Sequence, residues 1–375
     1  MDVTAEAAVA QRRLPQADPP VLSAKRLFGL DLVRAAAIAG VLVAHGAGAS
    51  ARLFGFEPTV WLYMGGHGVE LFFALSGFLI GGLLIDIVED TPGAQAWRVF
   101  MIRRWMRTVP LYVVCVLALL VIRPPADPGS TLISYLTFTQ NLAWPMPPWF
   151  DVSWSLPVEE WFYLSFSAFA VALSLLVGRC AIPIVCLAFI VAPIALRLAI
   201  APPDGNLDLL VRKITIFRLD SMAYGVLVVW WCRAWPAQCH RLRWPALALG
   251  AATTLGAVYA YPGETDPWRF SVLLALIPSG FALMLPAAAA WREARGSMST
   301  AIRWLSERSY CIYLIHLTLL GAALREAESG SIPRWLAIEV GLLATFVLAD
   351  LSYRFFEMPI LKRRPTLRTS VVATS

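Results

Sequence analysis

The chain has 375 residues, of which 58% are hydrophobic and 15% are charged, and its mean hydropathy is +0.65. Soluble globular domains carry about 25% charged residues. The composition therefore excludes a soluble domain and predicts an integral membrane protein. We attribute the net charge of +6 to membrane topology and an anionic ligand, and expect no nucleic-acid partner.

Ten apolar stretches predict an all-α, polytopic membrane fold, because a span needs about 20 residues. In chain order we expect transmembrane helices over 27–48, 67–88, 106–123, 155–178, 181–200, 214–232, 245–262, 269–291, 309–324 and 334–356. The fourth and fifth are separated only by a very tight turn at 178–180. We expect a cytoplasmic polar arm at 1–26, a transmembrane domain at 27–357 and a cytoplasmic tail at 358–375.

Lysine and arginine are unevenly distributed between the two sides of this arrangement. With the amino terminus in the cytoplasm, twenty of them fall in inside segments and seven in outside segments. Cytoplasmic segments of membrane proteins are enriched in these residues. Because the number of predicted helices is even, both termini are expected to be cytoplasmic.

Three ionisable residues lie along one face of the first predicted helix. Arg34 and His45 are eleven residues apart, which is about three full turns and about 16 Å along the axis. Asp31 lies near the same face. Ionisable residues inside a membrane usually line a pathway or a site. The alternative is that Arg34 reaches the inner surface, paired with Asp31, and that His45 lies at the outer interface.

An arginine cluster precedes the third predicted helix, in FMIRRWMRTVP at 100–110. Arg103 and Arg107 are one helical turn apart, and Arg104 is also a neighbour of Arg107. Guanidinium groups bind phosphate with two parallel hydrogen bonds, so the cluster is a candidate phosphate site at the cytoplasmic surface. The alternative is a simple anchor that holds the helix end inside.

Two adjacent carboxylates, Glu159 and Glu160, open the fourth predicted helix in WSLPVEEWFY. They point about 100° apart, so at least one is expected to face the protein interior. An ionised carboxylate is costly inside a membrane unless it is paired. A surface acid at the start of a helix, favoured by the helix dipole, is the alternative.

Further polar residues lie within the apolar stretches. His67 and Glu70 are one turn apart at the start of the second predicted helix, whose Gly and Ser residues suggest close packing. Arg218 and Asp220 are expected to pair with other helices. A structural or supporting role is expected for His316. The six cysteines show no metal-ligand spacing, and no metal site is expected.

Several of these stretches together resemble the membrane acyltransferase 3 family, the inner-membrane O-acyltransferases that modify surface polysaccharides and some antibiotics. The resemblance runs from LFGLDLVRAAA to YRFFEMP and includes the Arg–His spacing of the first helix, RWMR, WSLPVEEWFY, VELFFALSGFLI, FRLDSMAYG and SYCIYLIH. Glu70 stands where the family often has Asp, and Pro157 where it often has a smaller residue. Some members also carry an esterase-like domain, and we expect this chain to be the membrane module alone.

The resemblance implies transfer of an acyl group, most often acetyl, from acyl-coenzyme A to a hydroxyl of a carbohydrate or glycoconjugate acceptor. It implies that Arg34, Arg103, Arg104 and Arg107 bind the donor and that His45 is catalytic, as a general base or as a transient acyl carrier. We expect Glu159 to orient His45, as the acid of a catalytic triad does.

The remaining polar residues are assigned to the substrate or to a supporting shell: Asp31, His67, Glu70, Glu160, Arg218, Asp220 and His316. Two alternatives stay open at this point. One is a transporter or flippase of a lipid-linked sugar, and the other is an acyltransferase that acts on a small natural product such as a macrolide. The resemblance implies an inner-membrane, multi-pass location.

Overall fold

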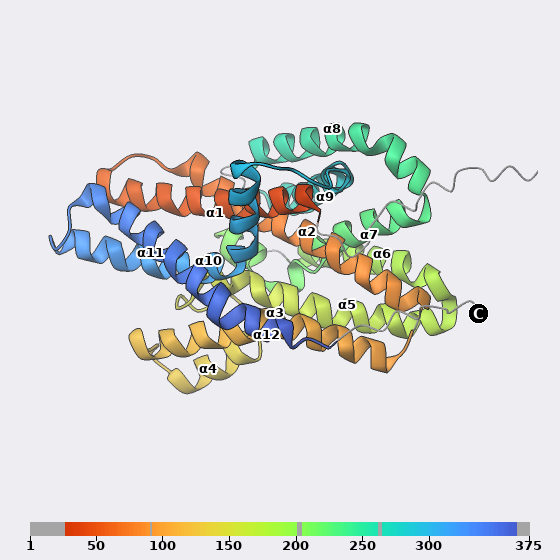
Figure 1. Cartoon of the computed structure of the whole chain (residues 1–375), viewed down its shortest axis with the longest axis horizontal. Helices are drawn as coiled ribbons and strands as arrows, with labels where there is room; N and C mark the ends of the chain where they lie inside the picture. Colours follow the sequence, from red (N-terminus) through yellow and green to blue (C-terminus); the bar gives the residue numbers. More distant parts are fainter. Residues whose placement is uncertain (1–26, 91, 201–204, 262–264, 366–375) are drawn as a thin grey trace, which may run out of the picture.

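The computed structural model describes residues 27–90, 92–200, 205–261 and 265–365. The predicted arm at 1–26 and residues 366–375 of the predicted tail lie outside this part of the chain. Within the described ranges every regular element is a helix (Figure 1). The expectation of an all-α fold is therefore confirmed for these residues.

Within the described residues, twelve α-helices follow one another along the chain. They are α1 (Phe28–Phe54), α2 (Thr59–Asp90), α3 (Ala94–Ile122), α4 (Pro128–Leu136), α5 (Ser155–Val177), α6 (Ala181–Ile200), α7 (Asp220–Ala234), α8 (Pro236–Ala260), α9 (Pro267–Ala290), α10 (Ser297–Glu328), α11 (Ala337–Ser352) and α12 (Met358–Lys362). Shorter helical turns include η1 (Asp151–Trp154), η2 (Gly178–Cys180), η3 (Asp208–Arg212), η4 (Thr215–Phe217) and η6 (Tyr353–Glu357).

A helix lies at each of the ten predicted ranges, but several helix ends were misplaced. Helices α3 and α10 begin at Ala94 and Ser297, where the predicted ranges began at 106 and 309. The prediction followed the apolar stretches, whereas both helices continue through flanking turns rich in arginine. The tight turn expected at 178–180 is the single 3₁₀ turn η2.

In the part of the chain that the structure describes, six helical segments are long and apolar enough to cross a membrane: Phe28–Phe54, Gly65–Asp90, Ala94–Ile122, Asp151–Ile200, Pro267–Ala290 and Arg334–Lys362. The segment Asp151–Ile200 contains both α5 and α6. These segments indicate a multi-pass membrane protein. The number of ten spans and the cytoplasmic location of both termini stay predictions.

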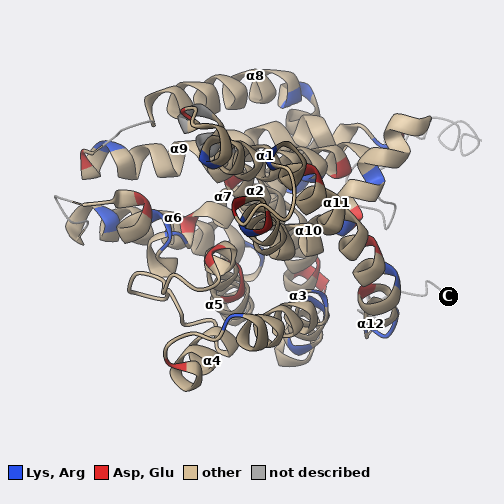
Figure 2. Ribbon diagram, turned by 90° about the vertical axis from the view of Figure 1, so that its left-hand side faces the viewer, with Lys and Arg blue, Asp and Glu red and all other residues tan. Residues whose placement is uncertain are grey.

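Helix α2 is the central element of the bundle and packs against α1, α5, α7 and α9. Figure 2, which looks along the bundle, shows it enclosed by its neighbours, with acidic positions on α2 and α5 inside the bundle. Its approach to α7 is close enough to require glycine. A Cβ added to Gly77 would lie 1.9 Å from the backbone oxygen of Met222, and one added to Gly225 would lie 2.1 Å from that of Ala74. The close packing predicted for this stretch is confirmed.

We expect Gly77→Ala to destabilise the protein, because the added methyl group must push α2 and α7 apart. Overpacking of this kind costs about 1–3 kcal/mol. Gly256→Ala on α8 is the matched control, since nothing lies within 4 Å of its added Cβ, and alanine favours a helix interior by about 1 kcal/mol. Denaturant unfolding of both purified variants measures the difference. Equal midpoints would contradict the packing argument.

Two buried ion pairs connect α7 and its preceding turn to other helices. Asp220 binds Arg197 of α6 through both carboxylate oxygens, at 3.0 and 2.8 Å, and Arg218 donates to Glu70 of α2 at 2.5 Å. All four side chains are almost completely buried. The prediction that Arg218 and Asp220 pair with other helices is confirmed. A disulfide between Cys232 and Cys239, which the spacing did not indicate, joins α7 to α8.

Candidate functional site

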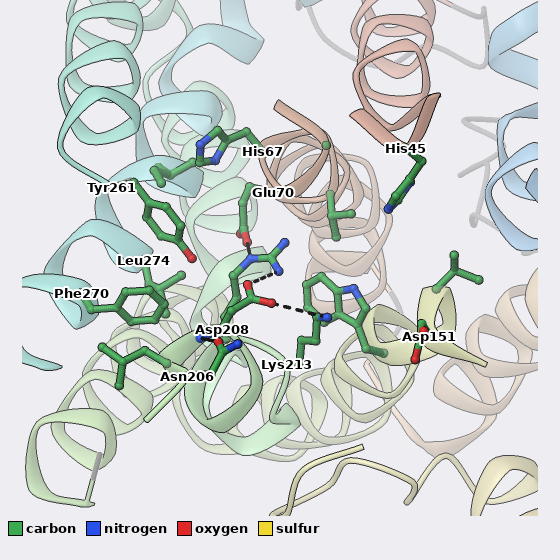
Figure 3. A pocket seen from close by; sticks show the side chains of 18 of the residues that line it. His45, His67, Glu70, Asp151, Asn206, Asp208, Lys213, Tyr261, Phe270 and Leu274 are labelled. Carbon is green, nitrogen blue, oxygen red and sulfur yellow. Dashed lines mark hydrogen bonds and ion pairs between the residues drawn. The ribbon is translucent and has the colours of Figure 1, made fainter. Parts of the chain in front are cut away.

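A cavity of about 620 Å³ opens beside the second half of α1 (Figure 3). We call it the upper cavity. Its ionisable and aromatic lining comes from α1, α2, η1, η3, the end of α8, the start of α9 and α10. It includes His45, His67, Glu70, Asp151, Trp154, Asp208, Arg212, Lys213, Tyr261, Phe270 and Tyr313. The lining is therefore mixed, with charged groups of both signs and several rings.

A second cavity, of about 220 Å³, lies between α1, α2, α3, α5 and α10. We call it the lower cavity. Four arginines line it, namely Arg34, Arg104, Arg107 and Arg364, together with the carboxylate of Glu159. The described lining thus carries four cationic side chains and one acidic side chain, which makes the cavity a candidate site for a ligand with several negative charges.

The two cavities adjoin, because Val69 and Tyr313 line both of them. Tyr313 is buried and held in place by its hydroxyl group, which donates to the backbone oxygen of Val152 at 2.6 Å and lies 2.8 Å from the Ser155 hydroxyl. Helix α1 runs past both cavities and contributes Arg34 to the lower one and His45 to the upper one. A slender ligand that extends from one cavity into the other would pass Tyr313.

Two arginines of the lower cavity, Arg104 and Arg364, have donors without a hydrogen-bond partner. Arg104 lies with its guanidinium 4.4 Å from the centre of the Tyr163 ring, and its Nε has no hydrogen-bond partner. Arg364 has two such nitrogens, and burial together with Arg107 and Arg104 lowers its pKa to about 10. Buried donors without partners are costly. An anionic ligand would satisfy them.

One predicted donor-binding residue lies elsewhere. Arg103 donates to the backbone oxygen of Pro365, after α12, and is not in the described lining of the lower cavity. The reason is helical geometry: Arg103 and Arg104 are adjacent and point about 100° apart. Sequence reasoning missed Arg364, which lies in the predicted tail and lines the cavity because α12, just before it, packs against α3.

The side chain of His45 contacts a second histidine. Its Nδ1 lies 2.9 Å from Nε2 of His316, which is on α10 and has no exposed surface. Glu159, expected to orient His45, lies in the lower cavity and accepts a hydrogen bond from Tyr163 at 2.8 Å. In the structure, the group next to Nδ1 of His45 is therefore the imidazole of His316 and not the carboxylate of Glu159.

The other predicted residues divide between the upper cavity and structural contacts. His67 and Glu70 line the upper cavity. Asp31 lies 3.9 Å from Arg34 and accepts from the Ser306 hydroxyl at 2.8 Å. Glu160 is buried and accepts from the Thr108 hydroxyl at 2.7 Å. These contacts hold α1 to α10 and α3 to α5, beside the lower cavity.

The sequence did not single out the charged groups of η3. Arg212 binds Asp208 at 2.8 Å and lies 4.6 Å from the centre of the Trp154 ring, and Lys213 lies 3.4 Å from Asp208 (Figure 3). The sequence analysis counted Arg212 and Lys213 only as charges outside the membrane. It did not anticipate that a short helical turn brings them into the lining of the upper cavity. No group of three or more histidine, cysteine or acidic residues is placed to hold a metal within the described part of the chain.

Comparison with known proteins identifies the family. A family model described as an acyltransferase domain matches residues 27–354. O-acetyltransferase OatA of Staphylococcus aureus (strain NCTC 8325 / PS 47) is 26% identical over 375 residues, covering 91% of this chain and 58% of that protein. OatA of strain COL of the same species gives the same values. No solved structure matches the chain.

The chain thus spans somewhat more than half the length of these relatives. The family model, in contrast, covers nearly all of the described helices, including the histidine pair and the lining of both cavities except Arg364. The chain belongs to the acyltransferase 3 family, and its matched region is an acyltransferase domain of a multi-pass membrane protein.

Proposed function

We propose that the protein is an inner-membrane O-acyltransferase that moves an acyl group, acetyl in the simplest case, from acyl-coenzyme A to a hydroxyl of a carbohydrate or glycosylated acceptor. The observation that carries this proposal is the adjoining pair of cavities. One is lined by four arginines and the other by His45, and both are lined by Val69 and Tyr313.

The lower cavity suits the donor. The nucleotide end of coenzyme A carries several phosphate charges, and guanidinium groups bind phosphate with paired hydrogen bonds. Arg34, Arg104, Arg107 and Arg364 supply them. Glu159 partly balances this charge, so we assign it to the donor end of the site. The pantetheine arm would then extend past Tyr313, which brings the thioester toward His45.

The upper cavity suits the acceptor. It is the larger of the two and has aromatic side chains and charged groups that can form hydrogen bonds with hydroxyl-rich molecules. His45 can remove the proton of an acceptor hydroxyl as its oxygen attacks the thioester carbonyl, with coenzyme A leaving as the thiol. Alternatively, His45 takes the acyl group first and passes it on.

A thiol-release assay tests the proposal. Purified protein is incubated with radiolabelled acetyl-coenzyme A and a panel of oligosaccharide and lipid-linked sugar acceptors. We expect label to move to an acceptor while free coenzyme A thiol appears in equal amount. A transporter would relocate its substrate without thiol release, and that result would contradict the proposal.

We expect Arg104→Gln to raise the KM for acetyl-coenzyme A by about 10- to 100-fold, since a hydrogen bond to a charged group contributes about 1.5–3 kcal/mol. Arg179→Gln is the matched control, because Arg179 is exposed in η2. Acetyl-pantetheine, which lacks phosphates, provides a second control. The variant and the native enzyme should use it equally well, and a deficit with both donors would assign Arg104 a structural role instead.

A further inference from the structure

The surroundings of His316 determine which of its nitrogens carries the proton. Its Nδ1 lies 3.0 Å from the backbone oxygen of Ile312 and 2.8 Å from that of Tyr313. A carbonyl oxygen can only accept a hydrogen bond, and a ring nitrogen without a proton can only accept as well. Nδ1 of His316 must therefore carry a proton and donate it to these carbonyls.

The tautomer of His316 in turn determines that of His45. A neutral imidazole has one N–H, so Nε2 of His316 is an acceptor. Its partner is Nδ1 of His45, at 2.9 Å, which must then be the donor. The proton of His45 therefore resides on Nδ1, and its Nε2 has a free lone pair.

A doubly protonated His316 is the alternative arrangement, and its environment opposes it. The side chain has no exposed surface, and burying a charge without an opposite charge is very costly. The hydrogen-bond partners in the structure are two carbonyl oxygens and one imidazole. The neutral ring satisfies all three contacts.

We propose that His316 is a positioning residue that holds His45 in the tautomer whose Nε2 is basic. This inference rests on the proposed function for its catalytic meaning, although the tautomer itself does not depend on it. During transfer, Nε2 of His45 would take the proton of the acceptor hydroxyl as its oxygen bonds to the acyl carbon. The imidazolium, still donating from Nδ1 to His316, would then return the Nε2 proton to the departing thiolate of coenzyme A.

The proposal explains why a histidine suits this position of α10. An acid in this place would also orient the ring, but it would put an ionised group among apolar helices. His316 accepts the same hydrogen bond as a neutral group, and the helix carbonyls of Ile312 and Tyr313 set its orientation. Tyr313 also lines both cavities, so one turn of α10 shapes the passage and orients the base.

Nitrogen NMR of the native protein tests the tautomer directly. The chain has four histidines, so protein labelled with ¹⁵N-histidine and reconstituted in nanodiscs gives few ring signals, which single variants assign. At neutral pH we expect both His45 and His316 to show a protonated Nδ1 and an unprotonated Nε2. A protonated Nε2 on neutral His45 would overturn the proposal, whatever the outcome of the transfer assay.

A pair of variants tests the catalytic consequence. His316→Leu removes the acceptor, and we expect kcat to fall about 10²-fold or more, with the KM for acetyl-coenzyme A unchanged. His316→Gln keeps an acceptor oxygen near the same place and should recover part of this loss. Equal kcat in the native protein and both variants would overturn the positioning role. Altered ring signals of the exposed His240 would show that a variant is misfolded. In that case the tautomers of His45 and His316 in the native protein, measured by NMR, decide whether the proposal stands.

Discussion

His45→Ala is expected to leave a folded, membrane-inserted protein whose acyl transfer is reduced by about 10²–10⁴-fold, the usual contribution of a positioned general base. The loss is expected in kcat, because the arginines that bind the donor lie in the other cavity. If His45 instead carries the acyl group, its removal abolishes the main route and leaves only background transfer. Initial rates at saturating acetyl-coenzyme A measure the effect.

His240→Ala is the matched control for this variant. It removes the same side chain from an exposed position on α8 and should leave kcat, KM and stability unchanged. Removing the His45 ring leaves one buried acceptor of His316 without a partner, which costs about 1–3 kcal/mol, so His45→Ala should remain folded. Native activity in His45→Ala would remove the central role assigned to this residue.

The helical fold was predictable because apolar stretches of sufficient length have few alternatives in a membrane. The helix ends were less predictable. Both α3 and α10 continue for several turns beyond the apolar residues, and these turns carry arginines that a hydropathy pattern assigns to loops. Helix α4, between the third and fourth predicted spans, has only 9 residues and is too short to signal a span.

The candidate site was predictable where one helix carries several of its residues. Arg34 and His45 were predicted to share a face of α1, and in the structure they line two adjoining cavities. Pairings between helices were not predictable in the same way. From the sequence, Glu159 and His316 are each plausible partners of His45. The packing of α10 against α1 decides between them, because it places Nε2 of His316 2.9 Å from Nδ1 of His45.

The other large effect expected concerns stability. Asp220→Ala should destabilise the protein by about 3–5 kcal/mol, because it leaves Arg197 as an uncompensated buried charge. Both side chains of this pair have no exposed surface. The double variant Arg197→Met with Asp220→Leu removes both charges and should recover most of the loss, since apolar replacement of a buried ion pair is often neutral or favourable.

An exposed ion pair with similar geometry is the control for this prediction. It shows whether the loss of stability comes from burial of the remaining charge or from loss of the ion pair itself. Arg52 and Glu328 lie 2.7 Å apart, with 61% and 40% of their side-chain surfaces exposed. Glu328→Ala should cost at most about 1 kcal/mol. Denaturant unfolding in one detergent compares all four proteins. If Asp220→Ala costs no more than Glu328→Ala, or the double variant is no more stable than Asp220→Ala, the buried pair does not control stability. The α6–α7 contact would then depend on apolar packing alone.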